Sequence, residues 1–138
     1  MCQRKSIAEY EEEAIKDLQI DVTQLKEYML ALGLHRIKWG RYLYNEESIL
    51  AQCEEKLNEL YKEKYNFYLY KSDEKVEKKS IDVYIKGDGE YKEAEKYYKM
   101  QKSKTKMVEQ VLNALDKQSF TVNTLLKHMM WESGASAQ

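Results

Sequence analysis

The sequence contains no proline and only five glycines among its 138 residues. Proline breaks the interior of a helix and glycine weakens it, so this composition leaves long, uninterrupted helices open to the chain. Charged residues, most of them Lys and Glu, make up 34% of the sequence, which favours helices over sheets. We therefore predict an all-α protein, and the length predicts a single domain over 1–138.

Histidine and cysteine, two common metal ligands, are equally scarce, with two of each. No Cys-x-x-Cys or His-x-x-x-His spacing occurs, and His35 and His128 fall on separate predicted helices. The GDG triplet at 87–89 lacks the strand-to-helix glycine pattern that holds phosphates, and paired carboxylates such as Glu54 and Glu55 are typical of solvated helix faces. The sequence therefore predicts no catalytic residue, no metal site, no cofactor and no enzyme.

Long hydrophobic runs are also missing. No apolar stretch approaches the ~18 residues that cross a bilayer, and the opening MCQRKSIAEYEEE lacks the apolar core of a signal peptide. Cys2 and Cys53 match no ligand spacing, and Cys53 falls at an apolar helix position, where a free thiol packs as a small hydrophobic group. These features predict a soluble protein in the reducing cytoplasm.

The charge is balanced overall but separated along the chain. A net charge of −1 and a pI near 6.2 do not by themselves indicate a nucleic-acid partner. Residues 7–21, however, carry six acidic side chains against Lys16, whereas 99–106 contains four lysines and no acid. The acidic segment is either a solvated helix face or a surface for a basic protein or for the lysine-rich helix of a neighbouring copy.

Capping residues and helical spacing predict an acidic N-terminal helix over 6–18 and a long helix over 22–70. Ser6 followed by Glu9 is a capping box, and Asp21 is suited to cap the second helix. The long helix carries apolar residues three and four apart along one seam: Val22, Leu25, Met29, Leu32, Trp39, Leu43, Leu50, Cys53, Leu57, Leu60 and Phe67.

This seam is incomplete. Arg36, Glu46 and Lys64 interrupt it with charges, and Asn45 before two glutamates resembles a second helix start. The 22–70 span is therefore one kinked helix or two helices that meet near residue 45. Because a helix cannot bury such a seam alone, we expect it to pack against other helices of the chain or against further copies.

In the second half of the chain, the sequence predicts a charged linker followed by another long helix. The linker covers 71–89 and includes a short alternating segment, Ile81–Ile85, that predicts an extended stretch. A returning heptad seam predicts the helix over 90–117. Polar side chains between Gln101 and Thr105 lie on that seam, so we expect loose or wet packing there.

A last helix is predicted over 121–132, with Ser119 and Thr121 as caps. Residues 133–138 are predicted to be a frayed tail, in which Gly134 closes the helix. One face of this helix is apolar: Val122, Leu125, Leu126, Met129 and Met130. The face is covered either inside its own protomer or by another copy.

The stretch LYKEKYNFYLY, at 60–70, interleaves lysines with aromatic residues. Single-stranded nucleic acid requires this combination, because cations follow the phosphates while aromatic faces stack on the bases, at ~1–3 kcal/mol per base. The alternative is that the tyrosines form a packing stripe and the lysines keep the chain soluble.

Two further basic clusters are Lys92, Lys96, Lys99 and Lys106 near Tyr98, and Arg36, Lys38 and Arg41 beside Trp39. Repetition of such patches in an oligomer would multiply phosphate contacts without making the protomer basic.

Four segments, in this order, resemble the UvsY recombination mediators of T-even-type bacteriophages. They are IDVTQL from Ile20, IKW from Ile37, LYKEKYNFYLY, and SFTVNTLLKHMMWESG near the C-terminus. The resemblance implies a non-enzymatic, ring-forming homo-oligomer that binds single-stranded DNA. Such a protein helps a RecA-like recombinase to displace the single-strand-binding protein during phage recombination, repair and replication in the host cytoplasm.

The resemblance also implies which residues contact DNA and which build the oligomer. In that family two basic residues around a spacer, followed by an aromatic pair, contact DNA; here they correspond to Lys62, Lys64, Phe67 and Tyr68. Lys38, Arg41 and Lys99 are further candidates, and the C-terminal helix is implied to build the oligomer. The alternative is a coiled-coil adaptor or scaffold without nucleic-acid binding. The two hypotheses differ in whether Lys62 and Lys64 face outward or are taken up by local ion pairs.

Overall fold

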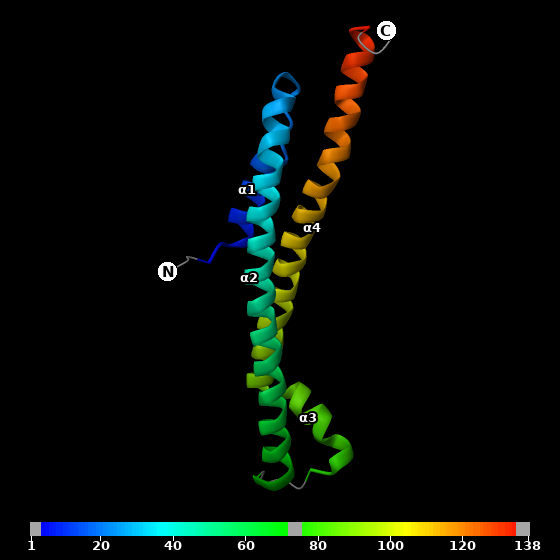
Figure 1. The fold of residues 1–138 in the computed structure, drawn as a ribbon. Coiled ribbons are helices and arrows are strands. Elements are labelled where there is room, and N and C mark those ends of the chain that lie inside the picture. Colours follow the sequence, from blue (N-terminus) through cyan, green and yellow to red (C-terminus); the bar gives the residue numbers. More distant parts are fainter. Residues whose placement is uncertain (1–3, 72–75, 135–138) are drawn as a thin grey trace. The chain divides into compact units, whose positions relative to one another are not determined.

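The structure, a computed structural model, describes residues 4–71 and 76–134, and over these ranges it contains helices and no strand. The prediction of an all-α fold is confirmed. The helices are α1 (Ile7–Leu18), α2 (Leu25–Asn66), α3 (Ile81–Gly87) and α4 (Gly89–Glu132), shown in Figure 1. Shorter turns lie between them: 3-10 helices at Val22–Gln24 and Lys78–Ser80, and a π-helix at Phe67–Lys71. Cys2, part of the 71–89 linker and most of the 133–138 tail lie outside the described residues.

The first two helices begin at the capping residues that the sequence indicates. Ser6 Oγ accepts a hydrogen bond from the backbone N–H of Glu9 at 3.2 Å, and α1 follows it. Asp21 Oδ1 accepts one from the N–H of Thr23 at 2.9 Å, so the chain enters a 3-10 turn and then α2. α2 runs for 42 residues through Asn45, so the alternative of two separate helices does not occur.

α4 replaces the two helices that the sequence predicts over 90–117 and 121–132. It is one helix of 44 residues. Ser119 and Thr121 do not cap a new helix there, because their hydroxyls donate to the carbonyls of the preceding turn, at 3.1 Å and 3.4 Å. A Ser or Thr bonded in this way fits inside a continuous helix. The helix ends before Gly134, whose φ of 74° is the left-handed conformation that glycine adopts after a helix.

The segment 81–85 is helical and not extended, so the prediction from its alternating pattern was wrong. Ile81 and Ile85 are fully buried, whereas Val83 is 70% exposed. Two buried residues four apart satisfy one helical face as well as an alternating strand, and a segment this short cannot separate the two periods. Asp88 then accepts hydrogen bonds from the N–H groups of Glu90 and Tyr91, which start α4.

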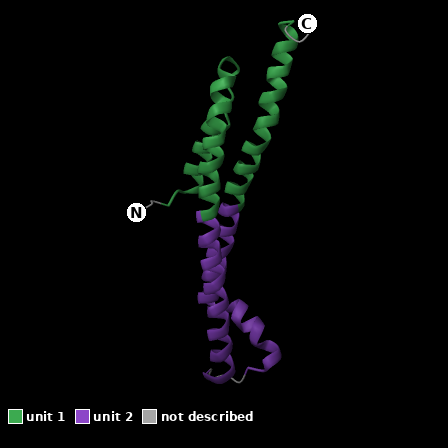
Figure 2. Cartoon of the chain, in the orientation of Figure 1, with its two compact units in different colours: residues 1–44, 106–138 green, residues 45–105 purple. Residues whose placement is uncertain are grey.

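The chain, for which the sequence predicts a single domain, divides into two compact units (Figure 2). Unit 1 comprises residues 1–44 and 106–138, and unit 2 comprises 45–105. In unit 1, α1 lies along the first part of α2 and the second part of α4 (Figure 1). Its core contains Tyr10, Ala14, Leu25, Tyr28, Leu32, Trp39, Val108, Leu115 and Val122.

Unit 2 contains a buried polar layer where the sequence predicts loose or wet packing. Gln101 Nε2 donates to Glu46 Oε2 at 2.6 Å, and Thr105 Oγ1 donates to the Glu46 carbonyl at 3.3 Å. Lys104 Nζ lies 3.4 Å from Glu46 Oε1, and the Glu46 residue is only 2% exposed. The polar seam positions of α2 and α4 therefore face and satisfy each other, which the spacing within either helix alone does not reveal.

Candidate nucleic-acid interface

The aromatic and basic stretch at the end of α2 is divided by the structure. Lys64 Nζ lies 2.8 Å from Glu90 Oε2 and 3.4 Å from Asp88 Oδ1. Its hydrogen bond to Glu90, together with the charge of Asp88, raises the pKa of Lys64 although burial opposes the change. The Tyr68 hydroxyl donates to Asp88 Oδ2 at 2.9 Å. Lys64 and Tyr68 therefore tie the end of α2 to the residue that caps α4.

Burial acts against ionisation of Asp88, but the hydrogen bond from Tyr68, that from the Tyr91 backbone and the charge of Lys64 lower the pKa of this carboxyl. Asp88 is thus the centre of a local network. Lys62 and Phe67 lie outside it: Lys62 is exposed, and Phe67 is 45% exposed, with its ring 5.3 Å from that of Tyr68 in a T-shaped arrangement. Of the four predicted DNA contacts in this stretch, Lys62 and Phe67 are exposed, whereas Lys64 and Tyr68 are partly buried.

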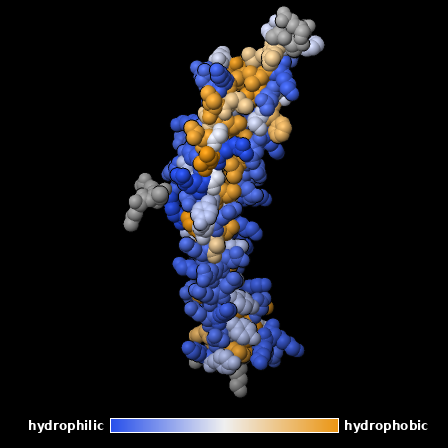
Figure 3. Space-filling view, in the orientation of Figure 1, coloured by the Kyte–Doolittle hydropathy of each residue, from blue (hydrophilic) through white to orange (hydrophobic). Residues whose placement is uncertain are grey.

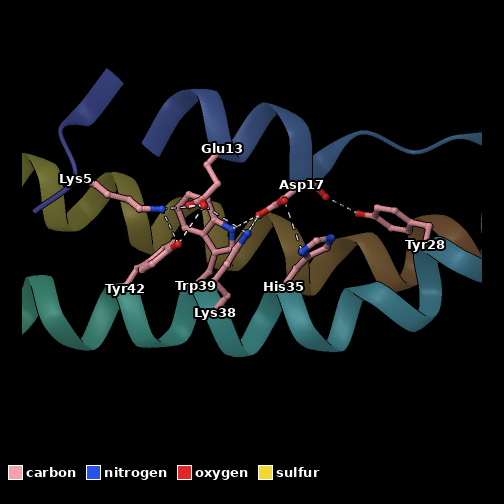
Figure 4. A network of polar contacts seen from close by, with 8 residues as sticks. All are labelled: Lys5, Glu13, Asp17, Tyr28, His35, Lys38, Trp39 and Tyr42. Atoms are coloured by element: carbon pink, nitrogen blue, oxygen red, sulfur yellow. Dashed lines mark hydrogen bonds and ion pairs between the residues drawn. The ribbon is translucent and has the colours of Figure 1, made fainter. Parts of the chain in front are cut away.

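Lys38 is taken up by an ion pair in unit 1, as Figure 4 shows. Its Nζ lies 2.5 Å from Asp17 Oδ2, and the same carboxylate oxygen accepts a hydrogen bond from Trp39 Nε1 at 2.8 Å. Burial opposes ionisation of Asp17, yet the hydrogen bonds from Lys38 and Trp39 and the charge of His35 lower its pKa. Lys38 is therefore the counter-ion of a buried carboxylate, whereas Arg41 is exposed.

A second polar cluster lies beside it. Lys5 Nζ donates to Glu13 Oε1 at 2.9 Å and to the Tyr42 hydroxyl at 2.7 Å (Figure 4). These contacts join the N-terminal segment and α1 to α2. Within residues 4–71 and 76–134, no group of three His, Cys, Asp or Glu side chains could hold a metal ion. No helix in those ranges is long and apolar enough to cross a membrane.

Lysines gather in unit 2 around a groove of about 710 Å³, which we call the lysine groove. It is lined by Lys86 of α3 and by Lys92, Glu95, Lys96, Lys99, Met100 and Ser103 of α4. Lys99 pairs with Glu95 at 2.9 Å one turn away, and both partners are partly or well exposed. Such a pair is worth only about 0.3–0.5 kcal/mol, so a phosphate can replace it at little cost.

The lysine groove includes Lys99, which the sequence predicts, and Lys86, which it does not. Lys92, Lys96 and Lys99 follow the i, i+4, i+7 spacing of one helix face, and this signal was visible in the sequence. The sequence predicts a linker at Lys86, and only the helical α3 brings this residue to the same groove. The groove therefore depends on an element that the sequence pattern misassigned.

The apolar face predicted on the last helix is largely used inside unit 1. Val122 is fully buried in the core, and Leu125 and Leu126 pack partly buried against it. Met129 and Met130 are 46% and 52% exposed. Of the five residues of this face, Met129 and Met130 are the most exposed.

The described residues thus form an all-α protein that carries a groove lined by lysines. A family model described as "Recombination, repair and ssDNA binding protein UvsY" matches residues 13–135. The chain belongs to the UvsY family, as its sequence segments suggested. The description of this family names recombination, repair and single-stranded DNA binding.

Solved structures of a bacteriophage T4 protein have the same fold as this chain. The crystal structure of the T4 recombination mediator protein UvsY in lattice type II matches with a TM-score of 0.86 and 16% identity, over 95% of this chain and 100% of that chain. The lattice type IV structure matches with a TM-score of 0.85 and 14% identity, over 93% and 99%. At this identity the likeness establishes the fold alone. No curated protein sequence matches the chain.

Proposed function

We propose that this protein is a recombination mediator that binds single-stranded DNA and loads a RecA-like recombinase onto DNA covered by single-strand-binding protein. It does so as a homo-oligomer, without an enzymatic step, in phage recombination, repair and recombination-dependent replication in the host cytoplasm. Family membership supports the role. The lysine groove is the observation that carries the DNA contact.

The lysine groove suits a phosphate backbone. Lys92, Lys96 and Lys99 lie on one face of α4 and extend over about 10 Å of its axis. No ion pair engages Lys92 or Lys96 in the described part of the chain, so phosphates meet unneutralised cations there.

Lys62 and Phe67 supply a second, smaller contact in our proposal, because both are exposed near the end of α2. Lys64 and Tyr68 position the start of α4 through Asp88 and do not bind phosphate themselves. Repetition of both contacts in a homo-oligomer multiplies the counterions released, which reconciles DNA binding with a protomer of net charge −1.

The test is fluorescence anisotropy of a labelled single-stranded oligonucleotide at several salt concentrations. Lys92→Ala with Lys96→Ala should make the fall of log K with log salt shallower by about 1.4 for each protomer that contacts the strand, because each lost phosphate contact contributes roughly 0.7 for single strands. The control, Lys117→Ala with Lys127→Ala, removes the same charge from exposed positions on the same helix in unit 1. Equal slopes for the two variants would place the DNA elsewhere.

The second candidate function is a scaffold without nucleic-acid binding. The ion pairs of Lys64 and Lys38 favour it, since local pairing of predicted DNA contacts is what a scaffold requires. The same titration separates the candidates. A scaffold binds neither single-stranded nor double-stranded DNA at low salt, whereas a mediator prefers the single strand.

A further inference from the structure

One side of α2 in unit 1 is apolar and uncovered. Tyr28 and His35 contact Asp17 of α1, and Leu30 and Ile37 lie two residues further along, about 200° around the helix. Leu30, Leu34 and Ile37 are 73%, 71% and 65% exposed. Figure 3 shows hydrophobic residues gathered on the surface that unit 1 forms. Large aliphatic residues at helical spacing on an exposed face are typical of a surface that packs against a further helix.

A groove of about 350 Å³ lies beside this apolar face, between α2 and α4. Gly33, Arg36 and Ile37 line it from α2, and Leu112 and Asp116 line it from α4. Arg36 Nε and Asp116 Oδ1 pair across it at 2.7 Å. A Cβ added at Gly33 would meet no atom within 4 Å, so the groove is open to an approaching helix at this point. We call it the α2/α4 groove.

The charges around the α2/α4 groove indicate what fits it. Lys26 and Arg41 lie one helical turn beyond either end of the apolar face, and both are exposed. α1, on the other side of α2, directs Glu11, Glu12 and Ile15 away from the core, and Ile15 is 62% exposed. No ion pair engages these lysine, arginine and glutamate side chains in the described part of the chain.

We infer that α1 of a second copy occupies the α2/α4 groove. Ile15 of that copy packs against the apolar face, and Glu11 and Glu12, one helical turn from Ile15, approach the basic residue at one end of that face. Each α1 is then buried on both sides, by its own protomer through Tyr10 and Ala14 and by the neighbour through the outer face. Because the donating and receiving surfaces differ, the contact is head-to-tail and closes into a ring when the rotation permits. The inference rests on the proposed homo-oligomer and gives it an interface.

Charge reversal tests the occupant by sedimentation velocity without DNA. Glu11→Lys with Glu12→Lys places a basic α1 against a basic groove, and Lys26→Glu with Arg41→Glu places an acidic α1 against an acidic groove. Each variant alone should lose the oligomer and sediment as a monomer, because like charges oppose the contact. A one-to-one mixture of the two should sediment as an oligomer again, because each α1 then meets a groove of opposite charge in the other variant.

Two further variants complete the design. Glu54→Lys with Glu55→Lys makes the same charge change at exposed positions of α2 in unit 2, and this control should sediment as the wild type does. Gly33→Leu fills the α2/α4 groove without a charge change and meets no atom within its own protomer at Cβ, so it should lose the oligomer while keeping its helicity by circular dichroism.

The inference is overturned if both charge reversals and Gly33→Leu leave the oligomer intact, or if the mixture stays monomeric after each variant has dissociated. A wild-type protein that is monomeric at every concentration also overturns it. These results concern the oligomer and its interface, whereas the contact of each protomer with DNA through the lysine groove lies in unit 2 and is tested separately by the Lys92→Ala with Lys96→Ala variant in anisotropy.

Discussion

Asp17→Ala should destabilise the protein far more than its single charge suggests. The Asp17 residue is 9% exposed, and its carboxylate accepts hydrogen bonds from Trp39 Nε1 and Lys38 Nζ. Hydrogen bonds to a charged group are worth about 1.5–3 kcal/mol each, and removal of one partner of a buried pair costs about 3–5 kcal/mol. Lys38 is 34% exposed and regains water, so we expect a loss of about 3 kcal/mol in the free energy of unfolding.

Asp116→Ala is the matched control. Asp116 pairs with Arg36 at 2.7 Å in the same unit, but both side chains are about half exposed. Exposed pairs contribute about 0–1 kcal/mol, so this variant should lose at most about 1 kcal/mol. Because Arg36 and Asp116 also line the α2/α4 groove, urea unfolding followed by circular dichroism compares both variants in the Gly33→Leu background, in which the oligomer is lost. If Asp17→Ala costs no more than Asp116→Ala, burial does not decide the strength of these pairs.

The same carboxylate predicts a pH dependence. The pKa of Asp17 lies below its ordinary value of 3.8 in the folded protein, so its contribution is fully present above the unfolded pKa. It is lost as the pH falls through the folded pKa, because protonation removes the charge that Lys38 and Trp39 contact. Asp17→Asn should therefore lose stability at neutral pH and show a weaker acid dependence than the wild type in the same unfolding experiment.

Other substitutions test the remaining buried and exposed positions. Glu46→Ala should cost about 3 kcal/mol in urea unfolding because it leaves a buried polar layer unsatisfied, and an unchanged midpoint would contradict that role. Lys62→Ala should make the fall of log K with log salt shallower by about 0.7 for each protomer that contacts the DNA, whereas Lys64→Ala should leave it unchanged; equal effects of the two variants in anisotropy would contradict this difference. Val122→Asp should unfold unit 1 by circular dichroism, whereas Met129→Asp should keep its helicity; loss of helicity in both would show that Met129 is a core residue.

Much of the helical fold could be read from the sequence because it depends on local rules. The Ser6 and Asp21 caps mark where α1 and the turn before α2 begin, and apolar spacing marks the long seams. The continuity of α4 through Ser119 could not be read, because a hydroxyl serves equally as a cap or as a donor to the preceding turn. The helical form of the segment around Ile81 was missed because five residues fit both periods.

The candidate site was harder to predict because charge pairing is a tertiary property. Lys62 and Lys64 look equivalent in sequence, yet α4 brings Glu90 to within 2.8 Å of Lys64 Nζ. Lys38, another predicted DNA contact, likewise forms an ion pair with Asp17, which is distant in sequence. Lysine spacing on α4 was readable, but the groove also needs Lys86, whose helix was not predicted.

The most direct test of the central claim is recombinase filament formation on single-stranded DNA already covered by single-strand-binding protein, with and without this protein. We predict that the wild-type protein shortens the lag before the filament forms, and that Lys92→Ala with Lys96→Ala restores much of the lag. A lag that is the same with and without the wild-type protein, at concentrations where it binds the DNA, would contradict the mediator function.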